Sequence, residues 1–220
     1  MERECIIRKH KSEAILKKQK IDFLKVLPCI EEEKDIEIKS LGKIAKRAVA
    51  SLLAIQLACD INRDIDIEES RDIVSKLISR YGVLNYLLPK EKKLFKGDYT
   101  KQDIIDITWT YEAYWVMLWA LGLVKMPFPN KTCNIKKAIR LVAIHENMNS
   151  FVAKCKLRSK KEILDMLDLY YRYSWACREN KIDSVTRIGK LNPDVVIERR
   201  RGLEWLISKE TDWFNISLDT

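Results

Sequence analysis

Glycine and proline are scarce in this chain, and that scarcity limits the fold class more than any other feature. The six glycines and five prolines make up about 5% of the 220 residues, against an average of about 12%. A sheet-rich domain of this size needs many tight turns, which these two residues supply. Apolar residues, at 47% of the chain, suffice for a sizeable core. The sequence therefore predicts long helices joined by few breaks.

Hydrophobic periodicity and capping residues divide the chain into about eight or nine helices. We expect a compact, single-domain, all-α bundle with no significant sheet. Residues 1–39 would form an N-terminal helix and an acidic loop, residues 40–207 the helical core, and residues 208–220 an irregular tail. The expected helices cover approximately residues 2–26, 40–59, 67–81, 90–96, 100–121, 134–146, 148–156, 160–182 and 192–207.

Cysteine spacing and the lengths of the apolar runs predict a cytoplasmic protein. The six cysteines lie at least 22 residues apart and form no Cys-x-x-Cys pair, unlike the dense frameworks of small secreted proteins. The first residues lack the apolar region of a signal peptide. The longest uncharged runs, 48–59 and 113–124, are 12 residues each, whereas a spanning helix needs about 20. We therefore expect no membrane segment.

Positive charge concentrates in one part of the chain. The net charge is +9, and residues 126–161 carry nine Lys and Arg against the single acid Glu146. Such a segment attracts phosphates or an acidic partner, but only Phe128 and Phe151 are available within it for base stacking. We interpret it as a solvated, lysine-rich face, with nucleic acid as the alternative partner.

Charged residues stand at apolar positions of three predicted helices. At about 100° per residue, Glu112 falls between Trp109 and Trp119 on one helical face. Arg178 lies within the apolar stripe of a second helix, and Arg199 near the centre of the stripe of the last helix. An unpaired buried charge costs several kcal/mol. We therefore expect Glu112 to pair with Arg178, Arg199 or both.

This predicted network has a structural and a functional interpretation. Structurally, a buried ion network fixes the helix register of a non-catalytic interaction module. Functionally, the two arginines hold an anion or nucleotide between tryptophan walls, or Glu112 acts as a catalytic acid with a raised pKa. On the last helix, Arg200, Arg201 and Glu204 are expected to point away from the stripe. The candidate residues are Trp109, Glu112, Trp119, Trp175, Arg178, Arg199 and Trp205.

The same segments carry four motifs in order. They are Trp-Thr-Tyr-Glu-Ala with Leu-Trp-Ala-Leu-Gly-Leu (109–123), Tyr-Ser-Trp-Ala-Cys-Arg (173–178), Glu-Arg-Arg-Arg-Gly-Leu-Glu-Trp (198–205) and the closing Asp-Trp…Leu-Asp-Thr (212–220). Together they resemble the signature of a bacterial family catalogued as domain of unknown function 4272, with Ser174 in place of its usual His. The resemblance reaches from about residue 27 to the end. It implies an all-helical protein and brings no activity with it.

Arg140 and His145 provide the alternative from the enzyme class. Their spacing is similar to the R-x4-6-H motif of the all-helical HEPN ribonucleases. In such a metal-independent mechanism the guanidinium holds a phosphate while the imidazole moves the 2′-hydroxyl proton. Arg3 and His10 match the same pattern, and Leu141 stands where a polar residue often follows the arginine. This ribonuclease is the enzymatic runner-up to the interaction module.

No motif predicts a metal or a cofactor. Residues 145–149 lack the second histidine of a zinc protease motif. Six scattered glycines form neither a phosphate-binding loop nor a dinucleotide fingerprint. We therefore expect no metal site, no cofactor and an unidentified protein partner.

Overall fold

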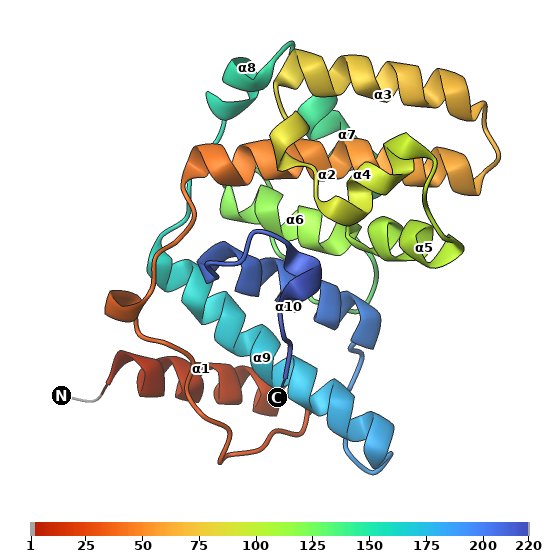
Figure 1. Ribbon diagram of the computed structural model, residues 1–220. Helices are drawn as coiled ribbons and strands as arrows, with labels where there is room; N and C mark the ends of the chain where they lie inside the picture. The colour runs from red at the N-terminus through yellow and green to blue at the C-terminus, as the bar shows by residue number, and fades with distance from the viewer. Residues whose placement is uncertain (1–2, 220) are drawn as a thin grey trace. The chain divides into compact units, whose positions relative to one another are not determined.

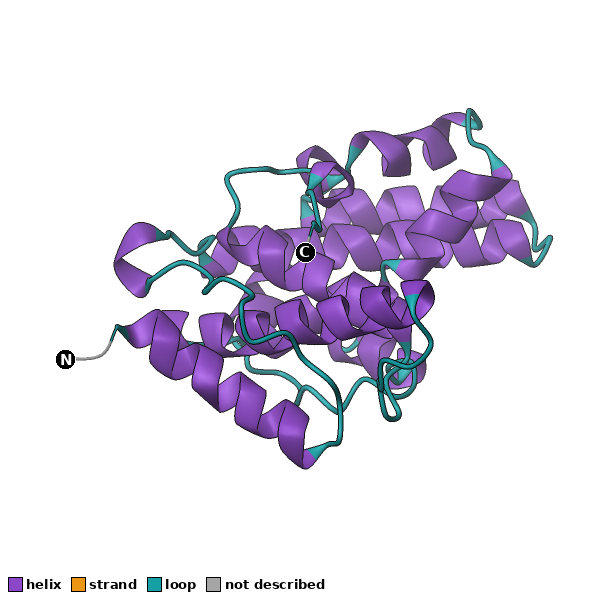
Figure 2. Cartoon of the chain, turned by 90° about the horizontal axis from the view of Figure 1, so that it is seen from below, coloured by secondary structure: helices purple, strands orange, loops and turns teal. Residues whose placement is uncertain are grey.

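The computed structural model describes residues 3–219. Every regular element in this range is helical (Figures 1 and 2), which confirms the all-α prediction. Three short 3-10 helices, η1 (Glu33–Asp35), η2 (Leu84–Tyr86) and η3 (Trp213–Asn215), accompany the α-helices. These are α1 (Glu4–Lys18), α2 (Leu41–Asn62), α3 (Ile67–Tyr81), α4 (Pro89–Lys96), α5 (Lys101–Trp109), α6 (Tyr111–Ala120), α7 (Ile135–Ala143), α8 (Met148–Val152), α9 (Lys160–Ile182) and α10 (Pro193–Ile207).

Four predicted helices are shorter than expected or interrupted. Those predicted over 134–146 and 148–156 end at Ala143 and Val152. The helix predicted over 2–26 ends at Lys18, because Lys20 adopts φ +57° and the Ile21 N–H donates to the Leu16 carbonyl at 3.0 Å. The helix predicted over 100–121 is interrupted at Thr110, which separates α5 from α6. The Thr110 hydroxyl donates to the Ile107 carbonyl at 2.6 Å, a side-chain bond that competes with helix continuation.

The chain divides into two compact units. The first contains the described residues up to Ile38, Met126–Thr132 and those from Arg158 onward. The second contains Lys39–Lys125 and Cys133–Leu157. The expectation of a single domain stays a prediction.

In the second unit, α2 is the central helix. It packs against α3, α4, α5, α6 and α8, and α3 runs alongside it (Figure 1). All ten residues of α6 are buried, as expected for a helix that is apolar on every side. The core of this unit therefore lies around α2 and α6.

A close backbone approach follows α6. Gly122 adopts φ +75°, and a Cβ there would lie 2.8 Å from the Lys156 carbonyl oxygen. The neighbouring Leu121 carbonyl accepts the Lys156 N–H at 2.9 Å. This hydrogen bond holds the backbone after α6 against the backbone after α8. Only glycine fits this position without a backbone shift.

We expect Gly122→Ala to lower the free energy of unfolding by about 3 kcal/mol, from the strained φ and the steric overlap together. Gly82→Ala is the matched control, because Gly82 has φ +63° but nothing within 4 Å of its Cβ position. That variant should lose only about 1 kcal/mol. Urea unfolding followed by circular dichroism measures both, and equal losses would show that the Lys156 contact has no cost.

In the first unit, α9 packs against α1, α10 and η1. The Lys160 ammonium donates to the carbonyls of Glu33 at 3.2 Å and Ile36 at 2.7 Å. These two hydrogen bonds hold the acidic loop that follows α1 against the start of α9. The long helix α9 therefore organises the unit.

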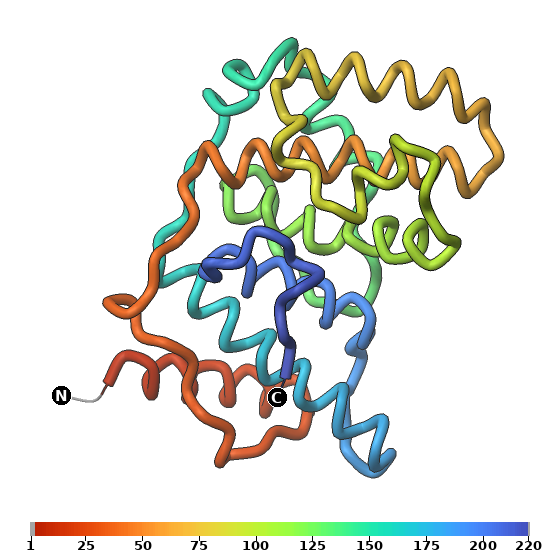
Figure 3. The backbone as a smooth tube through the Cα atoms, in the orientation of Figure 1, coloured from red at the N-terminus to blue at the C-terminus, as the bar shows by residue number. Residues whose placement is uncertain are grey.

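The predicted irregular tail folds back over α10 (Figure 3). Trp213 in η3 is 0% exposed. Arg200 is 2% exposed and donates to the carbonyls of Leu218 and Asp219, each at 2.9 Å. Arg200 was expected to point away from the apolar stripe of α10, and it is nevertheless buried because the returning tail covers it.

Candidate functional site

Glu112 is buried in α6, as its place on the apolar face predicts. Its side chain is 1% exposed, and Oε1 accepts the Cys133 N–H at 2.6 Å. A hydrogen bond from a backbone N–H to a carboxylate oxygen is among the stronger kinds in proteins. Within the second unit, Glu112 therefore fixes the segment that leads into α7.

Arg199 is also buried as predicted, at 0% exposure. Its Nη1 donates to the Pro127 carbonyl at 2.8 Å and to the Tyr170 hydroxyl at 3.1 Å. It therefore fastens the loop 126–129 to α9 and α10.

Arg178 differs from the expectation that it lies in the apolar stripe, because its side chain is exposed. Ile182, one turn later, is 76% exposed, so the last turn of α9 lies outside the core. The convergence of Glu112 with Arg178 and Arg199 stays a prediction.

The four candidate tryptophans differ in exposure. Trp119 and Trp205 are 4% and 1% exposed, Trp175 is half-buried, and Trp109 is 37% exposed. The Trp205 indole N–H donates to the Thr211 carbonyl at 3.0 Å, and its ring meets Trp213 edge-on. Trp119 and Trp205 are therefore core residues, whereas Trp109 presents its ring to solvent.

A buried ion pair in α9 escaped the sequence analysis. Arg172 donates to both carboxylate oxygens of Asp168, at 2.9 and 2.8 Å, and to the Pro28 carbonyl at 3.3 Å. Both side chains are 0% exposed. The i,i+4 spacing of opposite charges was the signal that could have identified it.

A second buried pair joins Arg47 of α2 to Glu91 of α4. Glu91 also accepts the Leu88 N–H at 2.8 Å and so caps α4. Arg47 donates to the Tyr86 carbonyl as well. The partners are 44 residues apart, and no local pattern connects them.

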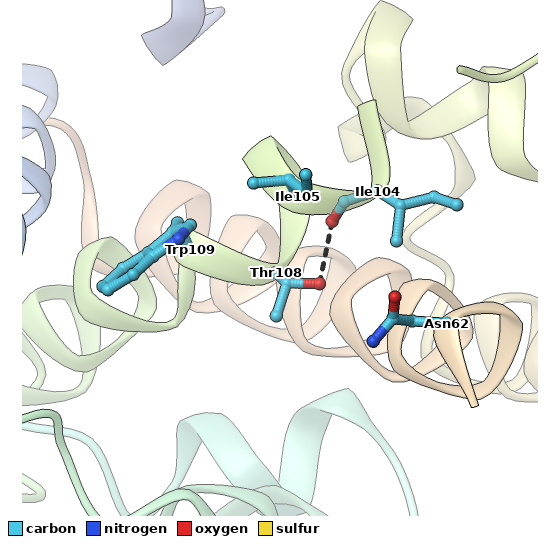
Figure 4. A pocket seen from close by; sticks show the side chains of 5 residues that line it. All are labelled: Asn62, Ile104, Ile105, Thr108 and Trp109. Carbon is cyan, nitrogen blue, oxygen red and sulfur yellow. Dashed lines mark hydrogen bonds between the residues drawn. The ribbon is translucent and has the colours of Figure 1, made fainter. Parts of the chain in front are cut away.

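A small pocket opens beside Trp109 in the second unit (Figure 4). Its volume is about 130 Å³. Ile105 is 48% exposed, and the Thr108 hydroxyl donates to the Ile104 carbonyl at 2.8 Å. Trp109 and Asn62 lie at opposite ends of the view. The lining residues are Asn62 of α2 and Ile104, Ile105, Thr108 and Trp109 of α5.

A larger pocket of about 170 Å³ lies in the first unit. The Tyr173 ring meets Phe128 at 6.2 Å and Tyr170 at 5.6 Å, edge-to-face in both cases. Burial raises the pKa of Tyr173 to about 12, so its hydroxyl keeps its proton and donates to Gln19 Oε1 at 2.7 Å. The lining residues are Ile15, Gln19, Met126, Pro127, Phe128, Pro129, Met166, Leu169, Tyr170 and Tyr173.

Comparison with known proteins gives one match. The family model described as Domain of unknown function (DUF4272) matches residues 8–216. The chain belongs to this family. The match confirms the family resemblance and extends it toward the N-terminus, and it ends at residue 216, within the fourth motif. No curated protein and no solved structure matches the DUF4272 chain.

The ribonuclease candidates of this DUF4272 chain lie near the end of α7. Arg140 is exposed, and His145 lies two residues after Ala143, the last residue of the helix. The Tyr81 hydroxyl donates to the His145 carbonyl at 2.6 Å, and the imidazole lies beside Phe151, with 5.6 Å between ring centroids. Neither candidate lines one of the two pockets. A catalytic role for the pair stays a prediction.

Residues 3–219 contain no group of three or more His, Cys, Asp and Glu side chains that could hold a metal ion.

Burial raises the pKa of Cys155 to about 11 and that of Cys177 to about 12, so both remain protonated thiols at neutral pH. Within residues 3–219, no helix of this DUF4272 member has the length and apolar character required to span a membrane.

Proposed function

We propose that this DUF4272 chain is a non-catalytic protein-interaction module of the cytoplasm. In this proposal, the pocket beside Trp109 receives an apolar side chain of a partner protein. The observation that carries the proposal is the exposure of a tryptophan and an isoleucine that line this pocket from the same helix, α5.

The geometry of α5 supports binding at this pocket. Ile105 and Trp109 are four residues apart and therefore neighbours on one helical face. Tryptophan contributes large apolar contact area and is enriched among the residues that dominate protein interfaces. The volume of about 130 Å³ is close to that of a cavity of about 150 Å³ that binds benzene. One Leu- or Val-sized side chain suits such a space.

The composition of the pocket supports binding without catalysis. None of its five lining residues is ionisable at neutral pH, so the pocket itself offers no general acid, general base or charged nucleophile. The alternative anion site at Arg178 and Arg199 has less support. Arg199 is 0% exposed and already donates to Pro127 and Tyr170.

The cytoplasmic setting is supported by the cysteines. All six lie in the described residues and are free thiols, and their wide spacing is unlike that of a disulfide framework. A reducing compartment keeps such thiols intact.

The test places the photo-crosslinker p-benzoylphenylalanine at position 105 in cells of the source organism, and at exposed position 76 as the control. A partner that crosslinks only from position 105 is then purified and titrated calorimetrically. We expect Trp109→Ala to weaken its binding by about tenfold or more, because truncation of an interface tryptophan typically costs about 2 kcal/mol. Trp109 is 37% exposed, so the variant should remain folded.

Unchanged affinity of the Trp109→Ala variant would contradict this role of the pocket. RNA cleavage by the purified chain that is lost in His145→Ala would instead establish the ribonuclease alternative.

A further inference from the structure

We propose that the pocket between α1, α9 and the loop 126–129 is a second docking site, which binds an acidic peptide segment of a protein partner through one inserted Phe- or Leu-sized side chain. This site lies in the first unit and shares no residue with the pocket beside Trp109. The inference is therefore independent of the proposed function.

The loop that forms one wall is held in place. The Pro127 carbonyl accepts from Arg199 at 2.8 Å, and the Pro129 carbonyl accepts the Asn192 N–H at 2.8 Å. Two prolines restrict its backbone further. Little ordering is required on binding, and a preformed wall of this kind favours affinity.

The interior of the pocket suits an apolar side chain. Its volume of about 170 Å³ slightly exceeds the roughly 150 Å³ of a cavity that accepts benzene. Ile15 is 40% exposed at its edge. Met126 and Met166 contribute flexible thioethers that adapt to different apolar shapes. A single aromatic or branched aliphatic side chain therefore fits.

Exposed lysines stand on the segments around the pocket. Lys18 and Lys20 flank Gln19, Lys131 follows Pro129 by two residues, and Lys190 precedes Asn192 by two. Among residues 3–219, no ion pair involves any of these four lysines. They therefore attract carboxylates of a partner.

The carboxylates of α9 nearest to Met166 are already occupied. Asp165 pairs with Lys161 at 2.9 Å, Asp168 with Arg172 at 2.8 Å and Glu162 with Arg158 at 2.7 Å. Because these carboxylates are already paired, they do not neutralise the four lysines around the pocket. The pocket therefore complements an apolar anchor with Asp and Glu on either side of it.

A cationic ligand is the competing occupant. The ring of Tyr173 stands nearly perpendicular to those of Phe128 and Tyr170, and aromatic cages bind methylated ammonium groups. However, no carboxylate lines this pocket, and the surrounding lysines repel a cation. The charge distribution favours the acidic peptide.

Methionine-methyl NMR of the full chain tests the proposal. Met126 and Met166 line the pocket and are two of the five methionines, whereas the buried Met117 and Met148 serve as internal references. The probe is a short synthetic peptide with one central Phe between Asp and Glu residues. We expect it to shift the Met126 and Met166 signals saturably and leave the reference signals in place.

Matched probes and variants separate the contribution of the inserted apolar side chain from that of the lysine charges. Replacing the central Phe by Ala should weaken binding by about tenfold, because the anchor is lost. Lys18→Glu/Lys20→Glu should weaken it by a similar factor. Lys92→Glu/Lys96→Glu makes the same charge change at exposed positions of α4 and should leave binding unchanged.

Three results would overturn the inference: unmoved Met126 and Met166 signals at millimolar peptide, equal shifts with a peptide that has Lys in place of Asp and Glu, or equal weakening by the two charge-reversal variants. A response to a trimethyllysine peptide alone would identify a cation site instead. The signals that report binding, those of Met126 and Met166, both come from the first unit. A negative result for this pocket is therefore distinguishable from a negative result at Trp109.

Discussion

Replacement of Asp168 by alanine is expected to lower the free energy of unfolding by about 3–5 kcal/mol, because it leaves a buried guanidinium without its counter-charge. Arg172 is 0% exposed and forms a bidentate pair with this carboxylate at 2.9 and 2.8 Å. The guanidinium cannot regain water without opening the packing of α9 against α1 and α10. Chemical denaturation followed by circular dichroism measures the loss.

An exposed pair of the same spacing is the control. Lys76 and Asp72 are also four residues apart, at 2.7 Å, with side chains 74% and 61% exposed. Asp72→Ala should lower stability by less than about 1 kcal/mol. The double variant Asp168→Leu/Arg172→Met should recover most of the loss of the single variant, because it buries no charge. A loss below about 1 kcal/mol for Asp168→Ala would show that water reaches Arg172.

The second large effect is expected at Trp213. Truncation to alanine should cost about 3–5 kcal/mol, since a large buried aromatic side chain is removed and a cavity remains. Its ring is 0% exposed and meets Trp205 edge-on at 6.0 Å. Because η3 is only three residues long, this side chain anchors the tail on α10. Urea unfolding measures the loss of stability.

Limited proteolysis provides a separate readout for Trp213→Ala, in which residues 208–219 should become rapidly cleaved. Phe214→Ala is the control, because the neighbouring Phe214 is only half-buried and its loss should cost much less. If both variants show the same stability and the same cleavage, the tail is held by Arg200 and not by the tryptophan.

Local signals in the sequence located the helix starts correctly. Ser40 accepts the Lys43 N–H at 3.3 Å, Thr100 and Asp103 form the expected capping box, and Ser159 forms one with Glu162. Asn192 caps α10 with Pro193 at its first position. These interactions connect residues no more than four apart. The sequence contains them directly.

Periodicity predicted burial better than it predicted partners. Glu112 and Arg199 lie at apolar positions of their helices and are buried. Glu112 accepts from Cys133, and Arg199 donates to Pro127 and Tyr170. Two of these partners, the Cys133 N–H and the Pro127 carbonyl, are backbone groups of loops. A hydrophobic pattern does not predict where a loop packs against a helix.

The sequence by itself determined the all-helical class, most helix starts and the burial of two charged residues, because capping and periodicity act within a few residues along the chain. Only the tertiary structure decided that Arg200 lies beneath the tail, that Arg47 meets Glu91 and that Trp109 faces solvent. The first two depend on segments that are distant in sequence. The third follows the break at Thr110, which separates Trp109 from the helix of Glu112. Such outcomes depend on which surfaces pack together, and no local pattern contains that information.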